Sequence, residues 1–203
     1  MRAVIVSRTK MGGNDRCIGA VAADNQSLRL LNQHGGHQSI TSPFQIGQWW
    51  EIEWTRPGVL TPPHVEDVLV RTCVLAGTQP DLCGYLLERV EPWRGGIERL
   101  FDGLLHFTNN NNGYICRRLG VPNRSTGFWL PDHDLTLEGD GKHFDYPSDV
   151  GVPRGLAYVG EAPASRVIPA GTLVRVSLAR WWRPNDAPDM EERCYLQLSG
   201  YYP

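Results

Sequence analysis

The residues in this sequence that are best suited to chemistry are arginines that lie next to tryptophans. The clearest group is Arg180-Trp181-Trp182-Arg183, where indole rings can stack on bases and guanidinium groups can reach phosphates. Successive side chains of a strand point to opposite faces, so the two rings cannot both be buried on one face. Two interpretations stay open: one ring faces a ligand, or one plugs a barrel end while the other covers a seam.

Two further clusters of cations lie near the start of each half of the chain. The first includes the hydroxyls of Ser7 and Thr9, and the second includes those of Ser125 and Thr126, with Trp129 close enough to add stacking. Hydroxyls and cations at strand ends suit contacts with phosphate, although a solvated hairpin end is the commoner use of such a cluster. The predicted phosphate contacts are Arg8, Lys10 and Arg16 in the first cluster, and Arg117, Arg118 and Arg124 in the second.

Patterns that indicate catalysis or a metal are missing from the sequence. On a strand, His64 and Glu66 would share one face while Asp67 points away, and two ligands do not make a metal site. The six histidines contain no His-x-x-x-His pair, and the five cysteines contain no Cys-x-x-Cys. No P-loop, dinucleotide-binding or nucleophile-elbow motif occurs. We therefore predict no catalytic residue, no metal and no cofactor.

Composition favours a protein of many short elements. The 203 residues include 22 glycines and 15 prolines, and the 20 basic residues include only two lysines. The net charge of −2 excludes binding of nucleic acid by bulk charge but leaves room for a local basic groove. No apolar run is long enough for a membrane span or a signal peptide, and scattered cysteines are typical of a reducing compartment. The expected location is the cytoplasm.

Alternation of apolar and polar residues predicts a mostly β chain with two similar halves. Strands are expected at residues 2–7, 17–23, 27–31, 48–56 and 64–74, and again at intervals beyond residue 114. Gly47 and Gly171 each precede an alternating strand, and Gly19 and Gly127 each lie within an earlier one. A glycine within a strand lets a small sheet bend into a barrel. We predict a first barrel at residues 1–78, a helical connector at 79–104 and a second barrel at 105–203.

The strand at residues 48–56 and the connector carry further tryptophans. Trp50 shares a face with Ile52, and Trp49 lies on the other face beside carboxylates that repel phosphate. This surface is therefore expected to be core or a domain interface. Trp93, in the connector, is expected to wedge between the two halves.

Several strings along nearly the whole chain resemble the prokaryotic dual OB-fold family. They are SRTKMG at 7–12, PPHVEDV at 62–68, PWRG at 92–95, LFDGL at 100–104, STGFW at 125–129 and AGTLVRVSLARWW at 170–182. The resemblance implies two tandem oligonucleotide/oligosaccharide-binding (OB) barrels and a nucleic-acid-binding role in bacterial defence or conflict systems. It implies no catalytic residues.

The resulting prediction is a non-catalytic protein that binds single-stranded or structured RNA or DNA. The residues expected to contact nucleic acid are Arg8, Lys10, Arg16, Arg117, Arg118, Arg124, Trp129, Arg180, Trp182 and Arg183. An alternative is an adaptor whose barrels dock a partner protein, because OB barrels host many functions. A weaker alternative is a nucleotide-processing enzyme with convergent histidine and carboxylate groups in a pocket.

Overall fold

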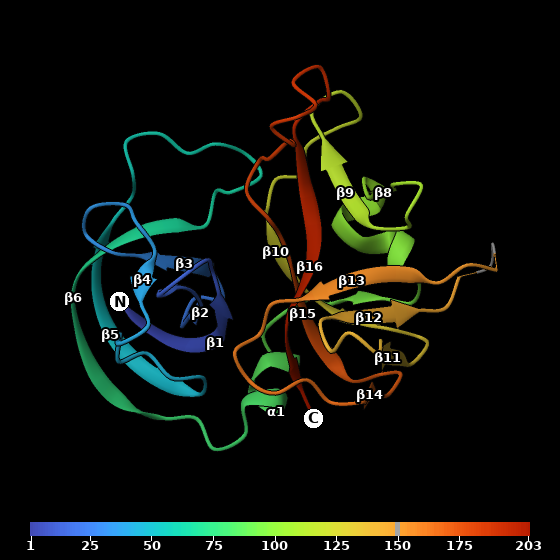
Figure 1. Cartoon of the computed structure of the whole chain (residues 1–203). Helices are drawn as coiled ribbons and strands as arrows, with labels where there is room; N and C mark the ends of the chain where they lie inside the picture. Colours follow the sequence, from blue (N-terminus) through green and yellow to red (C-terminus); the bar gives the residue numbers. More distant parts are fainter. Residues whose placement is uncertain (149–150) are drawn as a thin grey trace.

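A computed structural model describes residues 1–148 and 151–203 and contains two β lobes that lie side by side (Figure 1). The first lobe is a six-stranded sheet, and the second is built on a ten-stranded sheet. Helices are few and short, as the glycine and proline content indicates. None of the helices in the described ranges is long and apolar enough to cross a membrane.

The first lobe is a closed barrel of five main strands. They are β1 (Arg2–Lys10), β2 (Asp15–Ala22), β3 (Ser27–Leu31), β5 (Gln48–Thr55) and β6 (Asp67–Thr78), with a short β4 (Gln38–Ser39) beside β2. Pairing runs β1-β5-β6-β3-β2, and a further β1–β2 ladder closes the circle. The β3–β6 pair is parallel and the others are antiparallel. This arrangement is the five-stranded Greek-key barrel of OB folds.

The second lobe repeats this order of pairing with one interrupted strand. Its strands are β10 (Thr126–Leu130), β11 (Leu135–Leu137), β12 (His143–Tyr146), β13 (Arg154–Tyr158), β14 (Val167–Ile168), β15 (Leu173–Leu178) and β16 (Arg193–Tyr202). Pairing runs β11-β12-β13-β16-β15-β10, and β13–β16 is the parallel pair. Pro131 follows β10 and has no N–H for a ladder, so β10 and β11 are two parts of one broken first strand. Both lobes are therefore OB-like barrels.

Residues between the barrels form a connector of short elements. It contains α1 (Leu82–Leu87), β7 (Trp93–Arg94) and the 3₁₀ segment Ile97–Gly103, followed by β8 (His106–Phe107) and β9 (Gly113–Cys116). Asp81 caps α1 by accepting a hydrogen bond of 2.8 Å from the N–H of Gly84. The helix expected in the connector ends early, at Leu87.

Trp93 does not lie between the halves, contrary to expectation. Its ring packs on the core of the second barrel, 4.9 Å from the ring of Phe101 and directly over Gly127. A Cβ at Gly127 would lie 2.2 Å from that ring, so the strand glycine makes room for the indole. Leu86 of α1 takes the wedge position instead, because it is fully buried among residues of both barrels.

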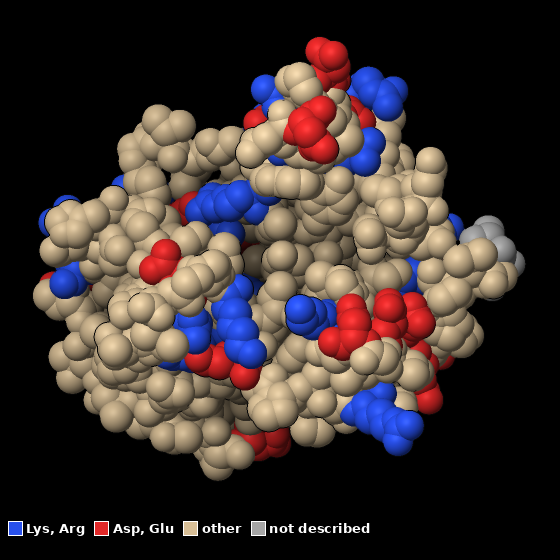
Figure 2. Space-filling view, viewed as in Figure 1, with Lys and Arg blue, Asp and Glu red and all other residues tan. Residues whose placement is uncertain are grey.

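Apolar surface is shared between the two barrels along a contact that we call the seam. Its buried residues are Val4, Val6, Val21, Trp49, Leu86, Phe128, Leu173 and Tyr202. The hydroxyl of Tyr202 donates to the carbonyl oxygen of Val6 at 2.7 Å. The N–H of Lys10 donates to the carbonyl oxygen of Val159 at 2.9 Å. The outer face of β1 and β2 is therefore covered by the second barrel, and Figure 2 shows a hollow where the two lobes meet.

The alternation expected at residues 48–54 is confirmed. Trp50 and Ile52 lie in the first barrel's core, and Trp49 lies in the seam. The strand expected at 64–74 starts later, at Asp67, because Thr61 and His64 form a bridge around two prolines that cannot donate to a ladder.

Candidate nucleic-acid interface

Two of the arginines predicted to contact phosphate are buried in the seam. Arg8 is 6% exposed and Arg16 is 7% exposed, and both pair with Glu161, which comes from the second barrel. Arg8 also donates to the carbonyl oxygens of Ser42 at 3.0 Å and Phe44 at 2.9 Å. The prediction that they contact phosphate is wrong, because these buried guanidinium groups already pair with groups of the protein. Lys10, at the end of β1, keeps an exposed side chain.

Glu161 carries the charge that these two arginines need. Burial raises the pKa of its carboxyl, but the hydrogen bonds from Arg16 and Arg8 together have a larger, opposite effect. The pKa therefore lies below its usual range. The backbone N–H of Glu161 also donates to the carbonyl oxygen of Arg8 at 3.0 Å. Main chain and side chain therefore tie the same residue to the opposite barrel.

A second carboxylate in the seam, Asp67, binds two arginines from opposite barrels. One oxygen accepts from Nε of Arg29 in the first barrel, and the other accepts from Nη2 of Arg180 at 2.7 Å. The neighbouring Glu66 accepts from the N–H of Ser125 at 2.6 Å and from its hydroxyl at 2.7 Å. Arg180, predicted as a nucleic-acid contact, is thus held to the seam by Asp67 but keeps a partly exposed side chain.

The acidic run beside His64 does not gather around a common ligand. His64 is 1% exposed, and burial first, then the charges of Arg29 and Arg180, lower its pKa to about 3. Its Nε2 atom lies 3.8 Å from Sγ of Cys194. The imidazole is therefore neutral near pH 7, and the adjacent Glu66 and Asp67 are occupied by other partners.

Trp129 is placed in the core and not on a surface. Its ring is 0% exposed, and its indole N–H donates to the carbonyl oxygen of Gly95 at 2.7 Å. The prediction that this ring stacks on a base is wrong, because strand alternation turns it inward while Phe128 faces the seam. Arg124 lies nearby over the ring of Trp93 at 4.5 Å.

The loop between β15 and β16 separates its two tryptophans. The indole N–H of Trp181 donates to the carbonyl oxygen of Pro62 at 2.8 Å, and this joins the loop to the β5–β6 loop of the first barrel. Arg117 lies over the same ring at 4.2 Å. Trp182 points outward and is 53% exposed. One tryptophan thus covers a junction of the barrels while the other faces solvent.

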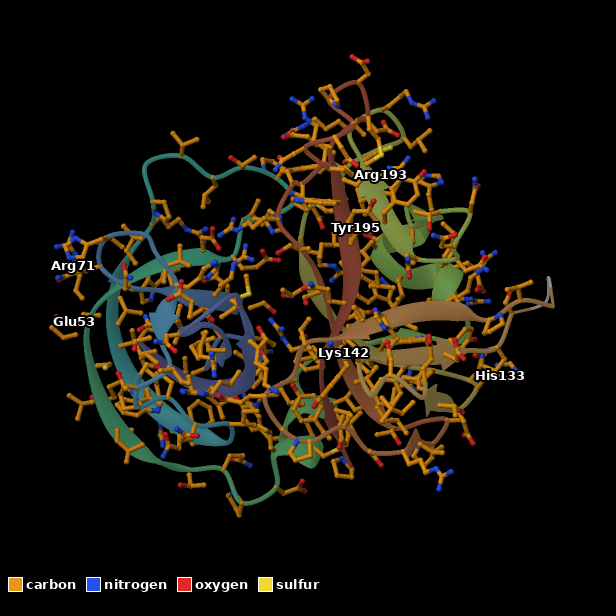
Figure 3. All side chains as sticks on the ribbon, viewed as in Figure 1. Glu53, Arg71, His133, Lys142, Arg193 and Tyr195 are labelled. Carbon is orange, nitrogen blue, oxygen red and sulfur yellow. The ribbon has the colours of Figure 1, made fainter. Side chains whose placement is uncertain are left out.

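Trp182 begins a line of rings that we call the aromatic ladder, formed by Trp182, Tyr195, Tyr114 and His106. Ring centroids are 6.0 Å apart for Trp182 and Tyr195, 6.3 Å for Tyr195 and Tyr114, and 6.0 Å for Tyr114 and His106. Arg193 lies over Tyr114 at 4.1 Å. Figure 3 shows Arg193 and Tyr195 together on β16.

Two more of the predicted cations lie close in sequence to residues of the aromatic ladder. Arg118 is exposed and lies 3.6 Å from Glu191, and Arg183 is exposed with Nη1 donating to the carbonyl oxygen of Pro188 at 2.9 Å. Tyr195 of the ladder and the neighbouring Arg193 are absent from the sequence prediction. Their signal was the alternation of β16, in which Cys194 and Leu196 are buried and the residues between them are not.

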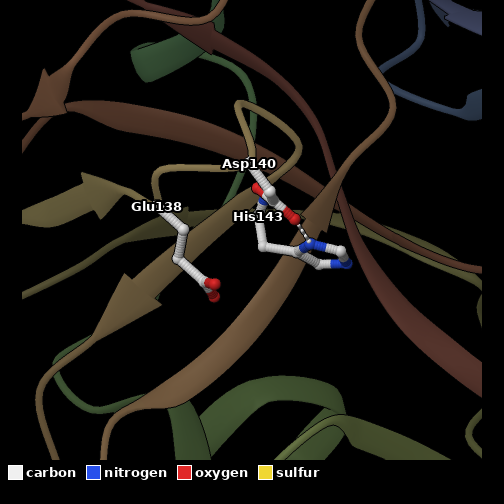
Figure 4. A group of neighbouring side chains, drawn as sticks. All are labelled: Glu138, Asp140 and His143. Carbon is white, nitrogen blue, oxygen red and sulfur yellow. Dashed lines mark hydrogen bonds and ion pairs between the residues drawn. The ribbon is translucent and has the colours of Figure 1, made fainter.

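A cluster of acidic side chains lies at another part of the second barrel. Glu138, Asp140 and His143 lie close together at the β11–β12 turn (Figure 4). Asp140 accepts from the backbone N–H groups of Lys142 at 2.7 Å and His143 at 3.1 Å and also bonds the His143 ring. These bonds, that to the His143 ring first, lower the pKa of Asp140 to about 2. The group is thus explained as a capped turn, and its carboxylates disfavour phosphate.

Two OB barrels in tandem, with two tryptophans on the β15–β16 loop, define a dual OB binding module. Residues 1–201 match the family model described as "Dual OB-containing domain", and the chain belongs to that family. The comparison with curated proteins and the comparison with solved structures each found no match.

Replacing Glu161 by Gln is expected to lower the free energy of unfolding by about 2–3 kcal/mol, because two buried guanidinium groups lose their shared carboxylate. The wild-type contribution is present above the ordinary glutamate pKa and is lost as pH falls through the lowered folded-state pKa. Urea unfolding at pH 7 measures the change. Glu53→Gln, at an exposed carboxylate, is the control, and equal midpoints for the two variants would contradict the assignment.

Proposed function

We propose that the protein binds single-stranded nucleic acid through the aromatic ladder and the arginines beside it. The observation that carries the proposal is the exposure of Trp182, whose ring is 53% exposed. Among the Trp, Tyr and Phe side chains that the structure describes, it is the one that is exposed. An exposed indole beside arginines offers a flat face on which a base can stack.

Stacking supplies affinity without sequence preference, because every base has a π-face. Trp182 and Tyr195 offer successive ring surfaces, and Arg193 and Arg117 supply charge at the same end of the barrel. Because the net charge of the chain is −2, binding is expected to be modest and to weaken steeply with salt.

Other surfaces of the two barrels suit this ligand less well. The outer face of β1 and β2 is closed by the seam, which includes Val4 and Val21. The β11–β12 turn of the second barrel exposes Glu138 and Asp140, which repel phosphate. The ladder end of the second barrel is therefore the surface favoured for nucleic acid.

Trp182→Ala is expected to weaken binding of a labelled single-stranded oligonucleotide by roughly 10-fold to 100-fold, because one stacking surface is lost. Fluorescence anisotropy at low and moderate salt measures the effect. Arg193→Ala should also weaken binding and reduce its salt dependence by about one counterion.

Arg71→Ala is the matched control, because Arg71 is exposed on β6, on the far side of the first barrel in Figure 3. Its affinity should equal that of the wild type. Wild-type protein that binds neither DNA nor RNA at low salt, or a Trp182→Ala variant that binds normally, would refute the proposed function.

We also propose that the protein acts in the cytoplasm as part of a bacterial defence or conflict system. Its five free cysteines suit a reducing compartment, and the defence role is supported by the family resemblance alone.

A second candidate function, docking of a partner protein, is favoured by the open edge of β6. β3 pairs with β6 only over its first residues, up to Leu69, so in the described part of the chain no strand covers that edge from Val70 to Thr78. Val74 is 65% exposed and Leu75 is 52% exposed on this stretch. Such an edge can accept an extended peptide as an added strand.

Selection from a library of random peptides tests this candidate. Wild-type protein should select peptides with alternating apolar residues, and Val74→Lys should lose them, because a lysine blunts a strand edge. Val59→Lys, at a loop position that is 83% exposed, should keep them. Failure of the wild type to select any such peptide would exclude the candidate.

A further inference from the structure

A small cavity in the seam is lined by cationic side chains from both barrels. Its volume is about 30 Å³, room for about two waters, so it can take one end of a compact ion but not a base or a sugar. The polar residues around it include Cys17, Arg29 and His37 from the first barrel, and Arg175, Arg180 and Gln197 from the second. None of the rings of the aromatic ladder lines it.

Arg175 is the most isolated charge at this cavity. It is 5% exposed, and Nη1 donates to the hydroxyl of Ser199 at 2.9 Å. Among the described residues, no carboxylate forms an ion pair with it. Gly19 leaves the room for its guanidinium, because a Cβ there would lie 2.7 Å from Nη2. Arginine keeps its proton in proteins, so this buried group stays charged.

Arg29, which also lines the cavity, has an unused donor. It is 7% exposed, and its Nε atom is paired with Asp67. Its Nη2 atom is buried and has no hydrogen-bond partner in the part of the chain that the structure describes. A buried donor without an acceptor costs free energy, and a charged donor costs more.

The seam contains more positive than negative charge. The arginines are Arg8, Arg16, Arg29, Arg175 and Arg180, and the carboxylates that face them are Glu66, Asp67 and Glu161. Five cations against three anions leave two positive charges in excess. A doubly charged oxyanion would cancel this excess and accept from the free guanidinium N–H groups.

We infer that this cavity binds one phosphate group between the two barrels. Arg175 and Arg29 would donate from the buried end, and Arg180, whose side chain is partly exposed, would donate at the mouth. Because guanidinium groups match the oxygens of phosphate, the site selects a tetrahedral dianion over chloride. The group can come from free phosphate or from the end of a nucleotide chain.

Isothermal titration of the full chain with inorganic phosphate at constant ionic strength tests the inference. One saturable site per chain is expected, with no comparable site for chloride. Arg180→Gln should weaken binding by about tenfold, because a charge-assisted hydrogen bond is lost. Arg71→Gln, a control far from the seam, should bind as the wild type does. Absence of saturable binding to the wild type, or unchanged binding by Arg180→Gln, would overturn the inference.

Two further experiments distinguish a strand end from free phosphate as the ligand, and the cavity from the aromatic ladder as the site. If a 5′-phosphorylated oligonucleotide competes with phosphate and its 5′-hydroxyl counterpart does not, the site binds a strand end. If neither oligonucleotide competes, the site binds free phosphate. Trp182→Ala should still bind inorganic phosphate fully, because the ring lies outside the cavity. Loss of oligonucleotide binding with phosphate binding intact would therefore concern the aromatic ladder alone.

Discussion

Buried arginines need opposite charges, and for Arg8 and Arg16 the charge comes from across the seam. Arg8 and Arg16 of the first barrel pair with Glu161 of the second, while Asp67 of the first barrel pairs with Arg180 of the second. Breaking such a pair leaves an uncompensated buried charge, which costs several kcal/mol. Separation of the barrels would also expose the apolar surface around Tyr202 and Leu86. The relative placement of the barrels is therefore fixed by electrostatics and by packing together.

This constraint decides which surfaces remain for ligands. Covering β1 and β2 removes one barrel face, and joining the two long loops through Trp181 and Pro62 turns Trp182 outward. The same joining places the exposed end of Arg180 at the edge of the seam. Nucleic-acid binding by the ladder and phosphate binding in the cavity are thus two consequences of one interface, although they use different residues.

Local patterns in the sequence predict the barrels better than they predict the site. Alternation was sufficient to place Trp50 and Ile52 in a core, because one face of that strand is clearly apolar. Alternation could not predict which way the Trp129 ring points, because both faces of β10 are covered. Trp129 lies in the barrel core and Phe128 lies in the seam. Arg8 looked like a surface cation because its partner Glu161 lies 153 residues away in a loop without a pattern.

Differential scanning calorimetry of the full chain tests the central claim, that the seam makes the two barrels one cooperative unit. A single transition is predicted, with a calorimetric enthalpy about equal to the van't Hoff enthalpy, because neither barrel keeps its buried charges paired without the other. Two resolved transitions, or a calorimetric enthalpy about twice the van't Hoff value, would show that the barrels unfold independently and would contradict the account.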